Sequence, residues 1–175
     1  RAIGQHDYAR LTQGPLENWL MATQRLLPCL TVLALASVAS AAINFKLDDQ
    51  YEKSHTQAEI FARKPVIMMA GMERKTPDAM EAWDKALRVR APKTARVVGL
   101  SNLEGVPFFV PKSAIKKALV KQMPDTVVLC DWKGKVYAEL GFPKGATISV
   151  AVFNASGDRL GIVNGPVTDE KVAEV

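Results

Sequence analysis

Residues 64–83 read KPVIMMAGMERKTPDAMEAW and combine a strand-like run with the start of a helix. Their apolar part, VIMMAG (66–71), is continuous and of strand length, which is typical of a strand covered on both faces. Thr76 is a favourable N-cap and Pro77 suits the first helical position, so a helix is expected to follow. Its inward side chains recur at helical spacing, at Met80, Trp83 and Leu87. The stretch therefore predicts a buried strand that leads into an amphipathic helix.

The rest of the chain alternates between strand and helix patterns. Strands are expected at 43–47, 95–100, 126–130, 147–154 and 159–165, a second helix behind a cap at Ser113, and a further helix start at 168–175. Residues 48–50 (DDQ) read as the turn after the first strand, and residues 155–158 (ASGD) as the turn of a hairpin. Strands that alternate with helices and end in a hairpin predict an α/β fold with a central mixed β-sheet flanked by helices.

The order of these elements resembles the thioredoxin-like superfamily. The segments similar to redoxin segments are the strand-to-helix unit at 64–83, the strand ARVVGL (95–100), the hairpin TISVAVFNASGDRLGIVNG (147–165) and the N-terminal hairpin NFKLDDQYEKSH (44–55). The resemblance covers most of residues 42–175 and implies a thioredoxin-like fold for a single domain there.

The reactive part of the redoxin pattern is missing from this chain. In that family the reactive thiols occupy the turn that opens the first core helix, where free backbone N–H groups stabilise a thiolate. Here the turn at 72–76 reads MERKT and holds no cysteine, and the position of the family's cis-proline falls on Ile148. The resemblance implies a catalytically degenerate domain that binds a ligand where the loops at 72–77 and 145–148 meet. The candidate ligand-binding residues are Arg74, Lys75, Thr76 and Ile148.

Residues 21–41 (MATQRLLPCLTVLALASVASA) have the organisation of a secretory signal peptide. A single base, Arg25, precedes a short apolar run, and small residues end in Ala39-Ser40-Ala41. We expect cleavage after Ala41, a periplasmic or secreted protein, and no stable membrane span after cleavage; an uncleaved anchor is the alternative. Residues 1–20 are expected to be an upstream extension, either disordered or outside the translated chain.

The composition is that of a globular protein. The chain has 175 residues, 48% of them apolar and 23% charged, which excludes a disordered chain and a disulfide-dense mini-protein. Its net charge of +5 comes from 23 bases interspersed with 18 acids rather than from a basic tail. After the predicted cleavage one cysteine, Cys130, and one histidine, His55, remain, which is too few for a Cys/His zinc site or a CxxC reaction. No metal or cofactor is therefore expected.

Three single features have competing interpretations. Cys130 is expected to be a small buried residue, and the alternative is a single-cysteine peroxidase or reductase that uses a resolving thiol from another molecule. Arg74 and Lys75 lie at a helix start, so an anion-binding module is a second alternative. His55 lies in a polar stretch and is expected on the surface or in a turn. Binding without enzymatic activity is the favoured hypothesis.

The segment VPFFV (106–110) lies next to a basic helix. Burial of its aromatic rings in the core is the favoured interpretation, and an exposed apolar patch is the alternative. The lysines at 112, 116, 117 and 121 are expected to point outward from the helix. A protein of the cell envelope is the expected partner of this surface, with Phe108, Phe109, Lys112 and Lys116 as its candidate contacts. Nucleic acid is not expected, because no aromatic residue interleaves with these lysines.

Overall fold

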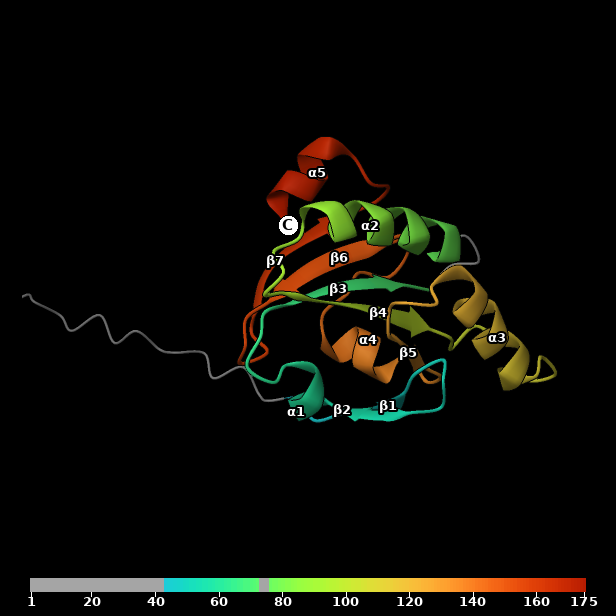
Figure 1. The fold of residues 1–175 in the computed structure, drawn as a ribbon. Helices are drawn as coiled ribbons and strands as arrows, with labels where there is room; N and C mark the ends of the chain where they lie inside the picture. Colours follow the sequence, from blue (N-terminus) through green and yellow to red (C-terminus); the bar gives the residue numbers. More distant parts are fainter. Residues whose placement is uncertain (1–42, 73–75) are drawn as a thin grey trace, which may run out of the picture. The chain divides into compact units, whose positions relative to one another are not determined.

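A computed structural model describes residues 43–72 and 76–175 of the chain (Figure 1). The predicted signal peptide (21–41) and the extension before it (1–20) lie outside the described residues, and so do Arg74 and Lys75. No helix in the described part is both long enough and apolar enough to cross a membrane.

The larger of the two sheets is mixed, as the sequence predicts. Within the described residues it has five strands in the order β5-β4-β3-β6-β7. The parallel strands are β3 (Val66–Gly71), β4 (Arg96–Asn102) and β5 (Val128–Asp131). The antiparallel strands are β6 (Ser149–Phe153), which pairs with β3, and β7 (Arg159–Asn164), which forms the predicted hairpin with β6.

Helices cover both faces of this sheet (Figure 1). On one face lie α2 (Thr76–Arg90), α3 (Lys112–Gln122) and α5 (Asp169–Glu174), and on the other lie α1 (Gln57–Ile60) and α4 (Lys135–Glu139). The central position of β3 in the sheet explains why the sequence of this strand is apolar throughout. Its side chains alternate between the two hydrophobic clusters, so every position meets a covered face.

The long helix α2 packs as its apolar spacing predicts. Met80, Trp83 and Leu87 are all buried between the helix and the sheet. The expected cap of α3 is wrong, because this helix begins at Lys112 and Ser113 lies inside its first turn. Pro111 occupies the N-cap position without a side-chain hydrogen bond. Its ring fixes φ at a value that lets the helix begin directly after it, without help from a hydroxyl.

A small antiparallel hairpin precedes the main sheet, as the redoxin resemblance implies. It consists of β1 (Lys46–Asp48) and β2 (Ser54–Thr56). The expected turn at 48–50 is misplaced, because Asp48 belongs to β1 and pairs with Ser54. The turn starts at Asp49, whose carboxylate oxygen Oδ1 accepts hydrogen bonds from the backbone N–H groups of Tyr51 and Lys53.

His55 is not a surface residue. It lies in β2 with only 9% of its area exposed, and its Nε2 is 2.8 Å from Oδ2 of Asp49. A polar neighbourhood in sequence suggested exposure, but the turn folds the carboxylate of Asp49 back over β2 and gives the ring a buried partner.

Candidate functional site

The first turn of α2 lies against the loop that enters β6. The hydroxyl group of Thr76 donates a hydrogen bond to the backbone oxygen of Thr147 over 2.8 Å. Gly71, at the end of β3, makes this approach possible. A Cβ atom there would collide with the Thr76 side chain and lie 2.8 Å from the Thr147 oxygen. The expectation that the loops at 72–77 and 145–148 meet is therefore confirmed for the described part of both loops.

A groove of about 370 Å³ opens beside this junction, between the start of α2, the segment after β4 and α3. Its walls are mainly apolar, with side chains from Met72, Val106, Pro107, Ile115 and Leu119. Polar groups also line it, from Thr76, Ser101, Asn102 and Gln122. The groove lies outside the carboxyl ends of β3 and β4, which is where open α/β sheets bind ligands.

Two residues of this groove could have been found from the sequence. Ser101 and Asn102 directly follow the predicted strand ARVVGL, and polar residues at the carboxyl end of a parallel strand often face a ligand. Gln122 carries no such signal, since its place in the groove depends on how α3 packs against α2.

Of the predicted ligand-binding residues, the structure describes Thr76 and Ile148. Both side chains are buried, with 2% and 0% of their area exposed. The hydroxyl of Thr76 already bonds to Thr147, and Ile148 packs in the cluster between the sheet and α2. The backbone oxygen of Ile148 accepts a hydrogen bond from the N–H of Gly165, so Ile148 presents no exposed surface to a ligand. Arg74 and Lys75 lie outside the described residues.

The phenylalanine pair near the groove is exposed, so its expected burial in the core is wrong. Phe108 is fully exposed (101%) and Phe109 is 73% exposed. The two rings meet edge to face, with their centroids 5.8 Å apart. Val106 is the residue of this segment that packs against the core, and its N–H bonds to the Leu103 oxygen. The turn that follows, in which the Val110 N–H bonds to the Pro107 oxygen, leaves both rings outside.

The lysines of α3 do not form one uniform outward face. Lys117 and Lys121 are exposed, as expected. The Lys116 side chain is only 13% exposed and its Nζ lies 3.7 Å from a carboxylate oxygen of Glu52. The Lys112 Nζ lies 4.9 Å from the centre of the Trp132 ring. Lys116 points toward the β1–β2 hairpin because helical periodicity carries its side chain away from the stripe of Lys117 and Lys121.

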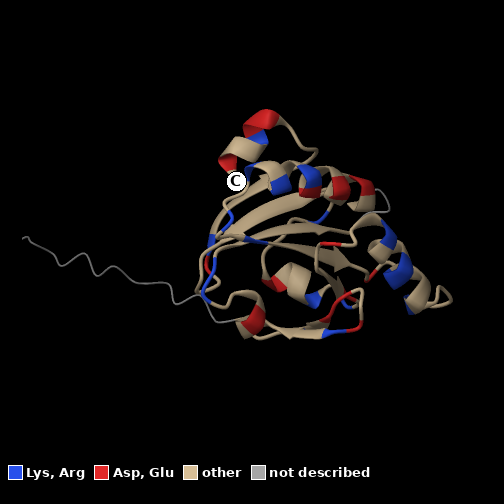
Figure 2. Cartoon of the chain, viewed as in Figure 1, with Lys and Arg blue, Asp and Glu red and all other residues tan. Residues whose placement is uncertain are grey.

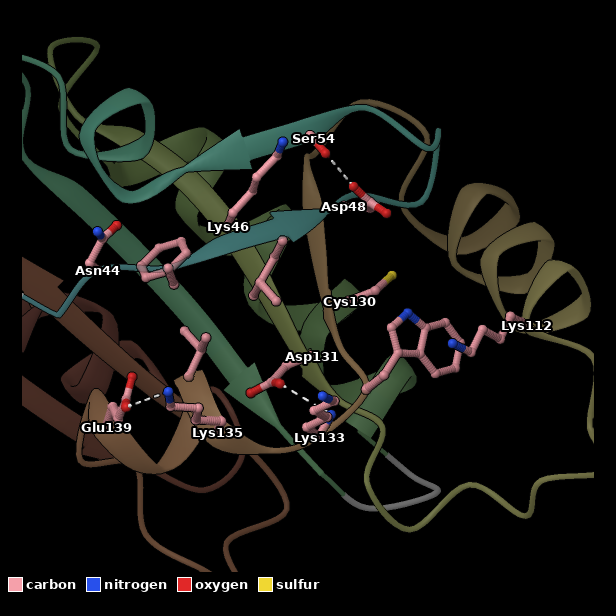
Figure 3. Close-up of a pocket in the computed structure, with 14 residues that line it drawn as sticks. Asn44, Lys46, Asp48, Ser54, Lys112, Cys130, Asp131, Lys133, Lys135 and Glu139 are labelled. Carbon is pink, nitrogen blue, oxygen red and sulfur yellow. Dashed lines mark hydrogen bonds and ion pairs between the residues drawn. The ribbon is translucent and has the colours of Figure 1, made fainter.

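A second cavity, of about 520 Å³, lies between β1, the end of β5 and α4 (Figure 3). Four lysines line it, at positions 46, 112, 133 and 135. Its acidic groups already have partners. The buried Asp131 accepts hydrogen bonds from the backbone N–H groups of Lys133 and Tyr137, and Glu139 lies 3.6 Å from Lys135. Cys130 also lines this cavity.

Cys130 is buried, as the sequence predicts, with 1% of its area exposed. Burial raises the pKa of its thiol to about 11, because a thiolate would lose its hydration. Lys116 opposes this shift, while Asp49 and Asp48 add to it. The raised pKa keeps the thiol protonated at neutral pH, and a protonated thiol is a poor nucleophile.

The described residues contain no group of three or more His, Cys, Asp or Glu side chains placed to hold a metal ion.

No protein-family model matches this chain, and no curated protein matches it. Many solved structures do. StoA from Bacillus subtilis is 12% identical with a TM-score of 0.58, over 77% of this chain and 97% of that protein. The exposed lipoprotein thioredoxin Etrx1 from Streptococcus pneumoniae is 15% identical with a TM-score of 0.58, over 75% of this chain and 96% of its own.

A secreted Mycobacterium tuberculosis disulfide oxidoreductase homologous to E. coli DsbE is also similar. It is 14% identical with a TM-score of 0.53, over 75% of this chain and 96% of that protein. Identities this low concern the fold alone. Together with the strand order, they show that the chain has a thioredoxin-like α/β fold, with a mixed central sheet flanked by helices.

Proposed function

We propose that this thioredoxin-like domain is an extracytoplasmic binding protein, and that it holds a segment of a protein partner in the groove beside the start of α2. The observation that carries the proposal is the groove itself. It lies where the reactive end of a redoxin would be, yet its described lining consists of apolar side chains with a few hydroxyl and amide groups.

The absence of thiol chemistry at this place is part of the proposal. The sequence has no cysteine between Gly71 and Pro77. The one cysteine among the described residues, Cys130, is buried with a pKa of about 11 and lines the other cavity instead of the groove. These observations support binding over both dithiol exchange and a single-cysteine peroxidase.

The groove's chemistry favours an extended peptide segment as the ligand. A volume of about 370 Å³ has room for a few side chains, and its apolar walls would cover them. The Asn102 oxygen already accepts from the Glu104 N–H, and the Gln122 amide nitrogen donates to Asp78. The Ser101 hydroxyl, the Asn102 amide nitrogen and the Gln122 oxygen remain to satisfy the polar backbone of such a segment.

The first experiment measures thiol chemistry in the full chain. Insulin reduction and peroxide consumption are compared between the wild type and Cys130→Ala, with a thioredoxin as the positive control. We expect both activities at the level of the buffer blank, with no difference between the two proteins. A peroxidase or reductase activity that Cys130→Ala abolishes would contradict the proposal.

The second experiment tests the groove directly in the producing cells. A photo-crosslinking residue replaces Ala118, which lines the groove, and in a matched control it replaces Ala82, an exposed residue of α2. We expect a discrete protein adduct at position 118 and none at 82. Equal labelling at both positions, or none at 118, would remove the support for a groove ligand.

The extracytoplasmic location is proposed from the signal-peptide pattern of residues 21–41. It is supported by two proteins of similar structure, one a secreted disulfide oxidoreductase and the other an exposed lipoprotein thioredoxin. Mass spectrometry of the protein recovered from the cell envelope would test it. A new N-terminus at Ala42 is expected, and recovery of unprocessed chain in the cytoplasm would contradict it.

A further inference from the structure

We propose that the loop before α3 and the exposed side of this helix dock on an anionic lipid surface. In this arrangement Phe108 and Phe109 enter the interface between lipid headgroups and acyl chains, while Lys117 and Lys121 face the headgroups. The surface is separate from the lysine-lined cavity, and the proposal does not depend on what occupies the groove.

The phenylalanine pair is the apolar part of this surface. Two adjacent aromatic rings at 101% and 73% exposure leave a continuous apolar area in water, which burial in any apolar medium would relieve. Their loop is bracketed by Pro107 and Pro111, so the chain loses little further conformational freedom when the rings insert.

The basic part lies on the helix that follows. Residues 112–122 carry four lysines and no acidic residue, and Figure 2 shows this positive charge along α3. Lys117 and Lys121 lie four residues apart, so they share one exposed stripe. Neither has an ion-pair partner among the described residues, in contrast to Lys116. Exposed phenylalanines followed by a helix with unpaired lysines are the combination that anionic membrane interfaces attract.

The shape of this surface favours lipid over a folded protein. Phe108 is fully exposed, so no neighbouring wall of this chain shapes a pocket around it. A rigid partner would need a matching cavity for the pair, whereas a fluid interface accommodates protruding rings of any shape. The positive charge of α3 complements phosphate groups, which supplies the second of the two signals that stable membrane docking needs.

The experiment places a reporter beside the rings in the full chain. Ser113→Cys, in a Cys29→Ser background, carries an environment-sensitive NBD dye, and the buried Cys130 stays unlabelled under native conditions. A matched reporter at Val89→Cys, an 84% exposed position of α2, controls for binding through other parts of the chain. The probes are vesicles of phosphatidylcholine with phosphatidylglycerol, and vesicles of phosphatidylcholine alone.

We expect a blue shift and a rise in NBD emission at position 113 with the anionic vesicles only, and no change at position 89. Replacing both rings (Phe108→Ser/Phe109→Ser) should weaken vesicle binding by about tenfold or more. Lys117→Gln and Lys121→Gln should each weaken it about fivefold. The exposed control changes Leu160→Ser and Lys93→Gln should leave it unchanged.

Three results would overturn the proposal. The first is no response at position 113 with either vesicle, which would leave a protein as the partner of this surface. The second is an equal response at positions 113 and 89. The third is a response that survives the loss of both rings. Thermal unfolding of each variant accompanies the binding data, and because the altered side chains are exposed, their melting temperatures should match the wild type.

Discussion

The imidazole of His55 and the carboxylate of Asp49 lie 2.8 Å apart, joining β2 to the turn that precedes it. Both side chains are largely buried, with 11% and 3% of their areas exposed. The same carboxylate also accepts hydrogen bonds from the backbone N–H groups of Tyr51 and Lys53. One aspartate therefore organises the whole turn of the N-terminal hairpin.

Asp49→Ala should lower the free energy of unfolding by about 3 kcal/mol, since it leaves a buried histidine and two backbone N–H groups without their acceptor. Urea unfolding measures this change. The exposed neighbour Asp48 is the matched control, and Asp48→Ala should cost no more than about 0.5 kcal/mol. Equal losses in the two variants would refute the role given to Asp49.

Gln50 attaches this hairpin to the main sheet. Its side-chain amide donates to the Thr126 oxygen at 2.7 Å, and its Oε1 accepts from the Val128 N–H at 2.8 Å. Gln50→Ala should destabilise the protein by about 2 kcal/mol, because buried backbone groups lose their partners. It should also speed hydrogen exchange at the Val128 amide. Tyr51→Phe, which removes an exposed bond to Pro124, should leave that amide protected.

Gly71→Ala should destabilise the fold by about 1–3 kcal/mol, because its Cβ would push into the Thr76 side chain and the Thr147 oxygen. Differential scanning calorimetry measures the effect as a lower melting temperature. Gly105→Ala is the control, since a Cβ there meets no atom within 4 Å. If both glycine variants melted alike, the close packing of the α2–β6 junction would be disproved.

Cys130 should make the free energy of unfolding depend on pH in the alkaline range. Burial raises the pKa of its thiol from 9.0 to about 11, so the folded state holds this proton more tightly than the unfolded state. This contribution to stability is fully present below about pH 9 and is lost as the pH rises through about 11. The total loss of unfolding free energy is about 3 kcal/mol.

The measurement for Cys130 is the difference in unfolding free energy between the wild type and Cys130→Ala, followed from pH 8 upward. The wild type should lose unfolding free energy relative to Cys130→Ala as the pH rises from about 9 to about 11. A native thiol that reacts with maleimide at neutral pH as fast as the thiol of the urea-unfolded chain would contradict the burial on which this prediction rests.

Several elements followed from local sequence because their signals concern neighbouring residues. The apolar run at 66–71 became β3 with the predicted bounds, since a strand covered on both faces needs an apolar side chain at every position. Met80, Trp83 and Leu87 are buried because helical periodicity places them on one face of α2. The hairpin of β6 and β7 likewise forms around its small polar turn.

The site depended on contacts between segments far apart in the chain. The groove exists because α3 packs near the start of α2, and Gln122 lines it for that reason alone. His55 is buried against the Asp49 carboxylate in the turn of the hairpin. Lys116 of α3 forms an ion pair with Glu52 of the same hairpin. None of these contacts leaves a periodic trace in sequence.

Periodicity and turn chemistry therefore predicted the strands of the mixed sheet and the helices α2, α3 and α5, in an order that resembles the thioredoxin-like superfamily, but not the short helices α1 and α4. Tertiary packing decided which side chains remain in water. Burial depends on what other segments cover, and for this reason only the folded chain shows that Val106 packs inside while Phe108 and Phe109 stay exposed.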